Sequence, residues 1–116
     1  MSDADVFDGA TLNRLLALGD HTFLDELFQL FIDDLDLYMP LIETALAAGQ
    51  APSVAGHAHA IKGAAGNVGA LRVAACAASL ERHARADSLS EAEGMFEALC
   101  DAVSEARAAI AARPRG

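Results

Sequence analysis

The hydrophobic residues of this chain follow a helical period along most of its length. From Leu24 they recur every three or four positions, and proline and glycine stand mainly between the periodic segments. The strict alternation of apolar and polar residues that marks a strand is rare. This pattern predicts an all-α protein. The longest run ends before Gly49 and includes Leu27, Phe28, Phe31, Leu35, Tyr38, Ile42 and Leu46.

Two helices are expected in the first half of the chain. Asp8 has the side chain to cap a short helix through about Leu18, and a glycine follows as a stop signal. A second helix over about 20–49 would, at 1.5 Å per residue, be roughly 40 Å long. Pro40 lies inside it, and its ring removes one backbone hydrogen bond and clashes with the preceding turn. We therefore expect a kink or a break near residues 37–38.

Three further helices are expected in the second half. Proline suits the first turn of a helix, so the third helix should begin around 52–53. A tight joint at 69–70 leads to the fourth, which ends around 85–87. Ser88 and Glu91 have the spacing of a capping box, which opens the fifth. The predicted inward positions are Val54, Ala58, Ile61, Ala65 and Val68 in the third helix, Val73, Cys76, Ala77, Leu80 and Ala84 in the fourth, and Met95, Leu99, Ala102, Val103 and Ile110 in the fifth.

The connections between these helices are short, which favours antiparallel neighbours. The expected architecture is an antiparallel up-down-up-down four-helix bundle, with a short additional N-terminal helix packed across one end. Residues 1–116 have the size of one domain with a single core, and we expect the ordered core over about 6–112. The last three helices are rich in alanine, so the large residues of the second helix must fill much of the core.

The charge and composition of the chain limit the classes of partner it can bind and the cellular compartment we expect for it. The chain has 17 Asp and Glu against 8 Lys and Arg, a formal net charge of −9, which argues against binding nucleic acid. The N-terminus lacks the regions of a secretory signal, and no apolar run reaches the ~18 residues of a membrane span. Cys76 and Cys100 lie in apolar surroundings without metal-ligand spacing, which favours reduced, buried thiols. We expect a cytoplasmic monomer that binds no membrane.

Residues 58–69, AHAIKGAAGNVG, carry the most distinctive side chains. In a helix, His59, Lys62, Gly63 and Gly66 share one face, so a nucleophile stands next to a cation. Each glycine costs helix stability, roughly 1 kcal/mol against alanine, which suggests that another molecule approaches this backbone closely. The segment predicts histidine phosphotransfer.

The chemistry of phosphotransfer fits these residue types. A neutral imidazole is a nucleophile near neutral pH, and transfer depends mostly on positioning and charge stabilisation. Lys62 is placed to stabilise the arriving phosphoryl oxygens and to disfavour the protonated imidazolium form of His59. Ala60, Gly63 and Gly66 have small or no side chains, so a partner can come close to the histidine. The segment contains no carboxylate, so we expect no metal site in this chain, and magnesium would have to come from the partner's site.

The same segment carries a family resemblance. Residues 58–81, AHAIKGAAGNVGALRVAACAASLE, closely resemble the signature of histidine-containing phosphotransfer (HPt) domains. The segments FDGATLNRLLALG at 7–19 and FLDELFQLFIDDL at 23–35 resemble the N-terminal half of that family, so the likeness covers nearly the whole chain. It implies structural roles for Gly69, Leu80 and Glu81.

The resemblance also implies a function. In HPt domains the histidine accepts a phosphoryl group from a receiver-domain aspartate and passes it to another receiver, which implies His59 as phosphoacceptor, Lys62 as phosphate-facing cation and Gly63 as the clearing for the incoming loop. The implied partners are response-regulator receiver domains and a hybrid sensor histidine kinase. No cofactor is expected in this chain. It has no kinase motif, so we expect a phosphocarrier without ATP-dependent kinase activity.

Two other classes of function are alternatives. A bundle that binds metal or haem is disfavoured, because di-iron bundles use Glu-x-x-His pairs and the four histidines here include neither such a pair nor two histidines at i, i+4. An adaptor or inhibitor could dock on a histidine kinase or a receiver domain through the same surface without carrying phosphate.

Several other residues have interpretations that involve only packing or solvent exposure. His57 lies about 200° around the helix from His59, so we expect it to be a solvent or packing residue. Gly56, and less readily Gly66, could instead serve close packing between helices. We expect His21 to belong to the turn that starts a helix and His83 to lie at the rim of the core. Three residues of the second helix could belong either to a docking surface or to the core, namely Phe23, Leu24 and Leu27.

Overall fold

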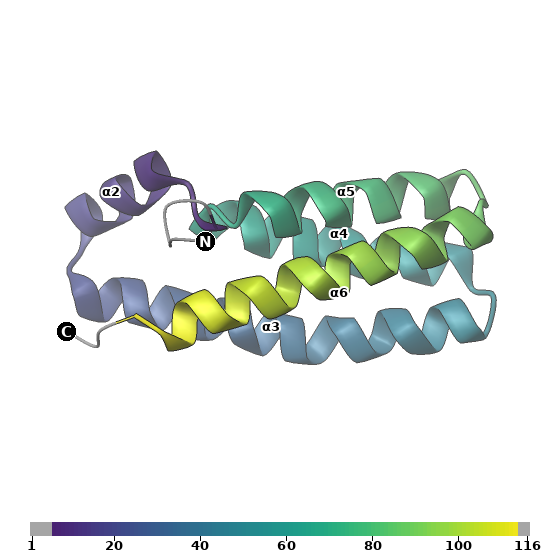
Figure 1. Cartoon of the computed structure of the whole chain (residues 1–116), viewed down its shortest axis with the longest axis horizontal. Helices are drawn as coiled ribbons and strands as arrows, with labels where there is room; N and C mark the ends of the chain where they lie inside the picture. Colours follow the sequence, from purple (N-terminus) through teal and green to yellow (C-terminus); the bar gives the residue numbers. More distant parts are fainter. Residues whose placement is uncertain (1–5, 114–116) are drawn as a thin grey trace.

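Helices make up the regular structure of residues 6–113, the part of the chain that the computed structural model describes. They are α2 (Gly9–Leu18), α3 (His21–Ala47), α4 (Ala51–Val68), α5 (Leu71–Arg85) and α6 (Leu89–Ala111). Figure 1 shows α3 to α6 running alternately up and down along the 43 Å long axis, and residues 6–113 contain no strand. The prediction of an all-α, up-down-up-down four-helix bundle is confirmed.

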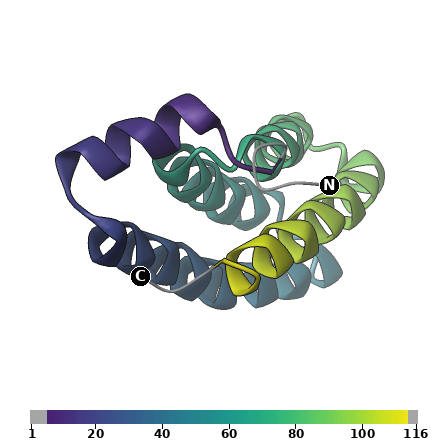
Figure 2. The ribbon, with the colours of Figure 1, turned by 60° about the vertical axis from the view of Figure 1, so that its left-hand side comes forward.

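The short helix α2 lies at the end of the bundle where α3 begins and where α4 joins α5 (Figure 1 and Figure 2). Asp8 caps it as predicted, because its carboxylate accepts hydrogen bonds from the Thr11 backbone N–H at 3.2 Å and the Thr11 hydroxyl at 2.7 Å. The Asp8 backbone N–H donates to the Gly69 carbonyl at 2.8 Å. Gly69 has φ +72°, and a Cβ there would lie 2.9 Å from the Thr11 side chain, so the joint requires glycine.

Large side chains of α3 fill much of the core, as the pattern predicts. Leu24, Phe28, Phe31, Leu35 and Ile42 are all buried. The facing helices contribute smaller buried side chains, which are Val54, Ala58, Ile61, Ala65 and Val68 of α4, Val73, Ala77, Leu80 and Ala84 of α5, and Leu99, Ala102 and Val103 of α6. In α4 to α6, three positions that the pattern placed inward are only partly buried, namely Cys76, Met95 and Ile110.

Pro40 does not break α3, so the predicted break near residues 37–38 is wrong. The helix continues through the proline as one 27-residue element. Pro40 itself is exposed, while Leu35 and Ile42 are buried on either side of it. Because Pro40 has no backbone N–H, the Asp36 carbonyl lacks its helical hydrogen bond. This carbonyl lies on the solvent-exposed side of the helix, where water can bind it. The buried contacts before and after the proline keep both parts of the helix on the core.

Two details at helix starts differ from the prediction. Ser88 precedes α6, but its side chain makes no capping hydrogen bond, so the capping box with Glu91 does not form. The ψ of Ser88 is 70°, outside the extended conformation that directs an N-cap hydroxyl at the first turn. The helix α4 begins at Ala51, one residue before the predicted start, with Pro52 in its first turn as expected.

Cys76 and Cys100 are free thiols, as predicted, but both are only partly buried. Burial raises the pKa of the Cys100 thiol, and the nearby carboxylates of Glu43, Asp101 and Glu97 act in the same direction. The neutral thiol is therefore favoured, which makes Cys100 a poor nucleophile.

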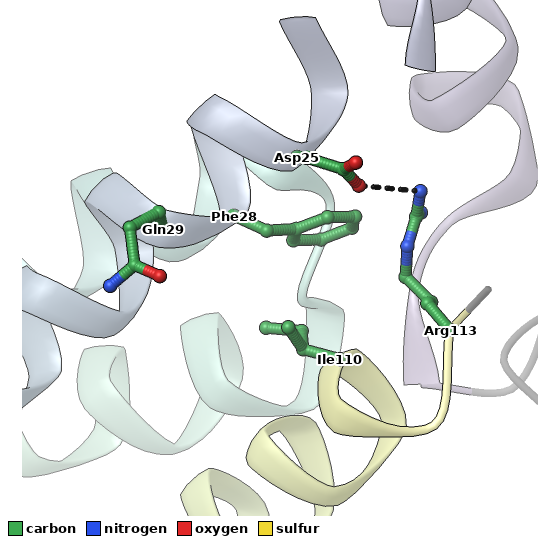
Figure 3. A pocket seen from close by; sticks show the side chains of 5 residues that line it. All are labelled: Asp25, Phe28, Gln29, Ile110 and Arg113. Atoms are coloured by element: carbon green, nitrogen blue, oxygen red, sulfur yellow. Dashed lines mark hydrogen bonds and ion pairs between the residues drawn. The ribbon is translucent and has the colours of Figure 1, made fainter. Parts of the chain in front are cut away.

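Arg113, just beyond α6, closes the end of the bundle between α3 and α6 (Figure 3). Its guanidinium lies 4.6 Å from the centroid of the Phe28 ring and 3.4 Å from the Asp25 carboxylate, and its side chain is only 15% exposed. Phe28 also packs edge-on against Phe7, with ring centroids 4.9 Å apart. Both ends of the described chain therefore meet on one phenyl ring.

We expect Arg113→Ala to lower the free energy of unfolding by about 1–2 kcal/mol, because it removes a cation–π contact together with a partly shielded ion pair. Arg14→Ala, on the exposed side of α2, removes the same charge and should cost less than about 0.5 kcal/mol. Urea denaturation of the two variants measures the difference. Equal losses would show that the contact on Phe28 contributes nothing of its own.

Candidate functional site

His59 projects from the wall of the bundle. It lies on α4 next to Ala58 and two residues before Ile61, which are both fully buried at 0% exposure. Because each residue turns the helix by about 100°, the side chain after Ala58 leaves the core. The His59 side chain is 62% exposed, so its imidazole is open to a globular partner.

A buried carboxylate on the neighbouring helix holds one side of this imidazole. Glu81 of α5 is 7% exposed, and its two oxygens lie 3.2 and 3.1 Å from Nδ1 of His59. Lys62 Nζ lies 2.8 Å from Oε1 of the same carboxylate. Arg85 donates to Oε2 from Nε at 3.0 Å and from Nη2 at 2.8 Å. One carboxylate therefore gathers a histidine, a lysine and an arginine from two helices.

The two cations keep the Glu81 carboxylate ionised. The hydrogen bond from Lys62 contributes most to lowering the pKa of Glu81 from 4.5 to about 2; burial opposes it, and hydrogen bonds from Arg85 and His59 add to it. An ionised carboxylate only accepts hydrogen bonds, so Nδ1 of His59 must carry the proton. The lone pair is then on Nε2, which has no hydrogen-bond partner within residues 6–113.

Glu81 is the contact that sequence reasoning missed, since the resemblance gave it only a structural role. It lies 22 residues from His59, across the joint between α4 and α5, so no helical spacing relates the two residues. A signal was nonetheless present in the sequence. Glu81 is the single carboxylate of α4 and α5, and those helices carry the four cations Lys62, Arg72, Arg82 and Arg85.

The surface of α4 around His59 is formed by residues with small or no side chains. Gly56, Gly63 and Gly66 are exposed on α4, and a Cβ on any of them would meet none of the described residues within 4 Å. None of the three therefore serves close packing against another described helix, which answers the open alternative for Gly56 and Gly66. Ala60 lies half-buried beside them. Such a face lets a second molecule come close to the backbone.

Comparison with known proteins bears on the family of this chain. The family model of the Hpt domain matches residues 26–109, which is most of the chain. The chain belongs to the Hpt domain family. Its structure is similar to that of histidine-containing phosphotransfer protein B from Pseudomonas aeruginosa PAO1, with a TM-score of 0.87 and 26% sequence identity over 93% of each chain. A search of curated proteins finds no match.

Membership of the Hpt domain family gives the general function. The chain is a phosphotransfer protein of a phosphorelay, and Hpt domains interact with receiver domains. The matched residues 26–109 contain all of α4 and α5, and hence the whole cluster around Glu81.

The other histidines of this Hpt domain lie outside that cluster. His57 packs against Tyr38 of α3, with ring centroids 5.9 Å apart. His21 is the exposed first residue of α3, and His83 is partly buried on α5. These positions agree with the packing, helix-start and rim interpretations.

The exposed apolar surface of α3 differs from the residues first considered for docking. Leu24 belongs to the core, and Phe23 and Leu27 are half-buried. Three exposed leucines of α3, Leu30, Leu37 and Leu41, are seven and four residues apart and therefore share one face of the helix. Leu30 lines a pocket together with Ala64, Asn67 and Val68 of α4, so this row adjoins the helix of His59. The row consists of Leu30, Leu37 and Leu41, which are 59%, 54% and 40% exposed.

Within residues 6–113, no group of three His, Cys, Asp or Glu side chains could hold a metal ion. None of the helices in the same range combines the length and the apolar character that a membrane span requires.

Proposed function

We propose that this Hpt domain accepts a phosphoryl group on Nε2 of His59 from the aspartyl phosphate of a receiver domain and transfers it to the aspartate of another receiver. The state of the imidazole is the main support: the side chain is 62% exposed, while Glu81 occupies its Nδ1. In-line phosphoryl transfer needs a nucleophile that protrudes with its lone pair toward the partner.

The transfer forms one bond and breaks another. Nε2 attacks the phosphorus in line with the leaving carboxylate oxygen, so the oxygen–phosphorus bond breaks as the nitrogen–phosphorus bond forms. Nδ1 keeps its proton, the ring becomes cationic, and the Glu81 carboxylate at 3.1 Å stabilises that charge. Attack by the aspartate of a second receiver reverses the step and returns the ring to its neutral form.

Lys62 is the phosphate-facing cation in this proposal. Its Nζ lies 2.8 Å from Glu81, and the side chain is 39% exposed, so the amine can turn toward phosphoryl oxygens at the surface. A cation there offsets the charge that arrives with the phosphoryl group. Magnesium held by the receiver's own site would supply further neutralisation.

The partners follow from the same chemistry. The donor is the receiver domain of a hybrid sensor histidine kinase, and the acceptor is a response-regulator receiver. The chain then works as a monomeric phosphocarrier in the cytoplasm, without nucleic acid or a cofactor of its own. It lacks a Gly-rich phosphate loop, so phosphate enters through a receiver and not from ATP.

The test is incubation with receiver domains carrying labelled aspartyl phosphate, after free label has been removed. The label should move to this chain, be labile in acid and stable in base, and be recovered on the peptide that contains His59. Addition of a second, unlabelled receiver should then remove it. Binding of receivers without any transfer would refute the proposal and support the adaptor or inhibitor.

The clearance at Gly63 gives a separate prediction. We expect Gly63→Leu to weaken receiver binding about tenfold or more, because a bulky side chain would hold the partner away from the helix backbone. The substitution meets open space within the described residues, and leucine is the better helix former, so the free energy of unfolding should not fall.

Gly94→Leu on α6 is the matched control for Gly63→Leu. It also points into open space, and it lies on a different helix. Isothermal titration with the receiver that labels the chain compares the two variants. Unchanged affinity of Gly63→Leu, or an equal loss in Gly94→Leu, would count against Gly63 as a clearing.

A further inference from the structure

A groove with a volume of about 230 Å³ runs between α3 and α6, away from the cluster around Glu81. Its apolar walls include Met39 and Pro40 of α3 and Phe96 and Cys100 of α6. Met39 and Phe96 pack against the core but are only partly buried, and Cys100 is partly buried as well. We call this feature the α3–α6 groove. It leaves apolar surface of two neighbouring helices accessible to a partner.

The groove begins where the ion pairs between the two helices end. Arg113 lies 3.4 Å from Asp25, and Arg107 lies 2.8 Å from Asp36, which joins the C-terminal part of α6 to α3 (Figure 1). Within residues 6–113, no ion pair joins the two helices beyond Asp36. The groove extends along α3 from Asp36 to Glu43, about 10 Å at 1.5 Å per residue. That length matches about two turns of a helix.

The charge around the groove is negative. The helix α3 carries six carboxylates and neither lysine nor arginine, and α6 carries five carboxylates against Arg107. Burial raises the pKa of the Cys100 thiol, and the charges of Glu43, Asp101 and Glu97 raise it further, so these carboxylates lie close to the groove. All three are exposed, and none belongs to an ion pair within residues 6–113.

The polar groups of the groove are mainly hydrogen-bond acceptors. Pro40 leaves the Asp36 carbonyl without its helical donor, and both residues line the groove, so this carbonyl is available there. Arg107, the single cation among the described residues that line the groove, is engaged by the Asp36 carboxylate. A partner that fits the groove therefore brings positive charge and hydrogen-bond donors together with an apolar face.

We propose that the α3–α6 groove binds a basic amphipathic helix of a partner protein. The apolar face of that helix would lie on Met39 and Phe96, since helix-in-groove recognition uses apolar residues three or four positions apart. A methionine side chain adapts to different apolar shapes. Lysines or arginines flanking the apolar face would meet Glu43, Glu97 and Asp101.

The charge of the two helices selects this occupant over others. A second copy of the chain would bring the same carboxylates of α3 and α6 to the groove, and anionic lipid or nucleic acid would also bring like charge. The groove shares no lining residue with His59, Lys62 or Glu81. A helix bound there leaves the His59 imidazole exposed, so the inference goes beyond phosphotransfer and does not depend on it.

The probe for the groove is a synthetic peptide of about 18 residues, long enough to form a helix, with leucines on one helical face and lysines on the other. A second peptide has glutamate in place of every lysine. Binding to the full chain is measured by fluorescence anisotropy at about 0.15 M salt, where distant charges are screened. The lysine peptide should bind, and the glutamate peptide should not.

Two pairs of variants locate the bound peptide. Glu43→Gln should raise the Kd of the lysine peptide about three- to tenfold, because it removes a charge at the groove. Glu26→Gln removes the same charge about 25 Å away along α3 and should leave the Kd close to wild type. Met39→Gln should also raise the Kd about three- to tenfold. Its control is Leu30→Gln, at an exposed leucine of α3 that faces α4.

Binding that weakens equally in Glu43→Gln and Glu26→Gln would show a response to net charge alone and overturn the proposal. Equal losses in Met39→Gln and Leu30→Gln, or binding of the glutamate peptide, would overturn it as well. Sedimentation equilibrium of the chain alone tests the remaining occupant. A dimer that dissociates in Met39→Gln would assign the groove to a second copy, whereas a monomer supports the basic helix.

Discussion

Replacing His59 with glutamine should reduce phosphoryl uptake from a labelled receiver by more than about 10³-fold, because the side chain loses its nucleophilic nitrogen. Glutamine is close to histidine in size and polarity, and its amide can still meet Glu81. Gly56, Gly63 and Gly66 are not altered, so receiver affinity should stay within about threefold of wild type. Uptake is measured by transferred label, and affinity by titration.

His57→Gln is the matched control for His59→Gln. It changes the same residue type two positions away on α4, where the ring packs against Tyr38 at 5.9 Å. Uptake should remain at the wild-type level in that variant. Label that persists in His59→Gln, or disappears in His57→Gln, would assign the acceptor to another side chain and refute the proposal for His59.

The inward face of α4 illustrates what the sequence could predict. Its buried residues recur with the helical period from Val54 to Val68, and all five predicted positions are buried. His59 follows the inward position Ala58 by one residue, which turns it off that face, and it is exposed. The caps at Asp8 and Gly69 were also readable, because each depends on a local residue type.

Contacts between distant residues could not be predicted in the same way. The pairing of His59 with Glu81 depends on the angle at which α5 returns from the joint, and the contact of Arg113 with Phe28 crosses most of the chain. Periodicity describes one helix at a time and contains no information on such angles. Pro40 failed as a predicted break for a related reason, since burial on both sides of it outweighs the local preference.

The second large effect is expected at Glu81. Glu81→Gln should slow phosphoryl transfer about 10- to 100-fold, because a neutral amide stabilises the cationic ring less and can donate to Nδ1, which moves the proton to Nε2. The lone pair would then face the protein instead of the receiver. Receiver affinity should change little, so the loss should appear in the transfer rate at saturating receiver.

Glu105→Gln is the matched control for Glu81→Gln. Glu105 is a carboxylate of α6 that is paired with Arg72 at 2.9 Å, so the variant breaks a comparable ion pair away from His59. It should transfer phosphate at the wild-type rate. Equal slowing in both variants would show that Glu81 acts only through general stability.

The pH dependence of folding separates a structural from an electrostatic effect of Glu81. Its pKa is about 2 in the folded chain against an ordinary 4.5, so the folded state favours the ionised form. That stabilisation is complete above about pH 4.5 and is lost as the pH falls toward 2. The free energy of unfolding should therefore fall less steeply with acidification in Glu81→Gln than in wild type. Identical slopes between pH 5 and 2 would contradict the ionised carboxylate.

The protonation of the His59 ring gives the most direct readout of how Glu81 acts. Nitrogen-15 shifts of the imidazole distinguish a proton on Nδ1 from one on Nε2, and a merely structural role for Glu81 would not move that proton. Wild type and Glu105→Gln should carry it on Nδ1, since an ionised carboxylate at 3.1 Å only accepts. Glu81→Gln should show a mixture, because the amide both donates and accepts. If the proton stays on Nδ1 while transfer still slows, the carboxylate acts through the charge of the phosphorylated ring and not through the tautomer.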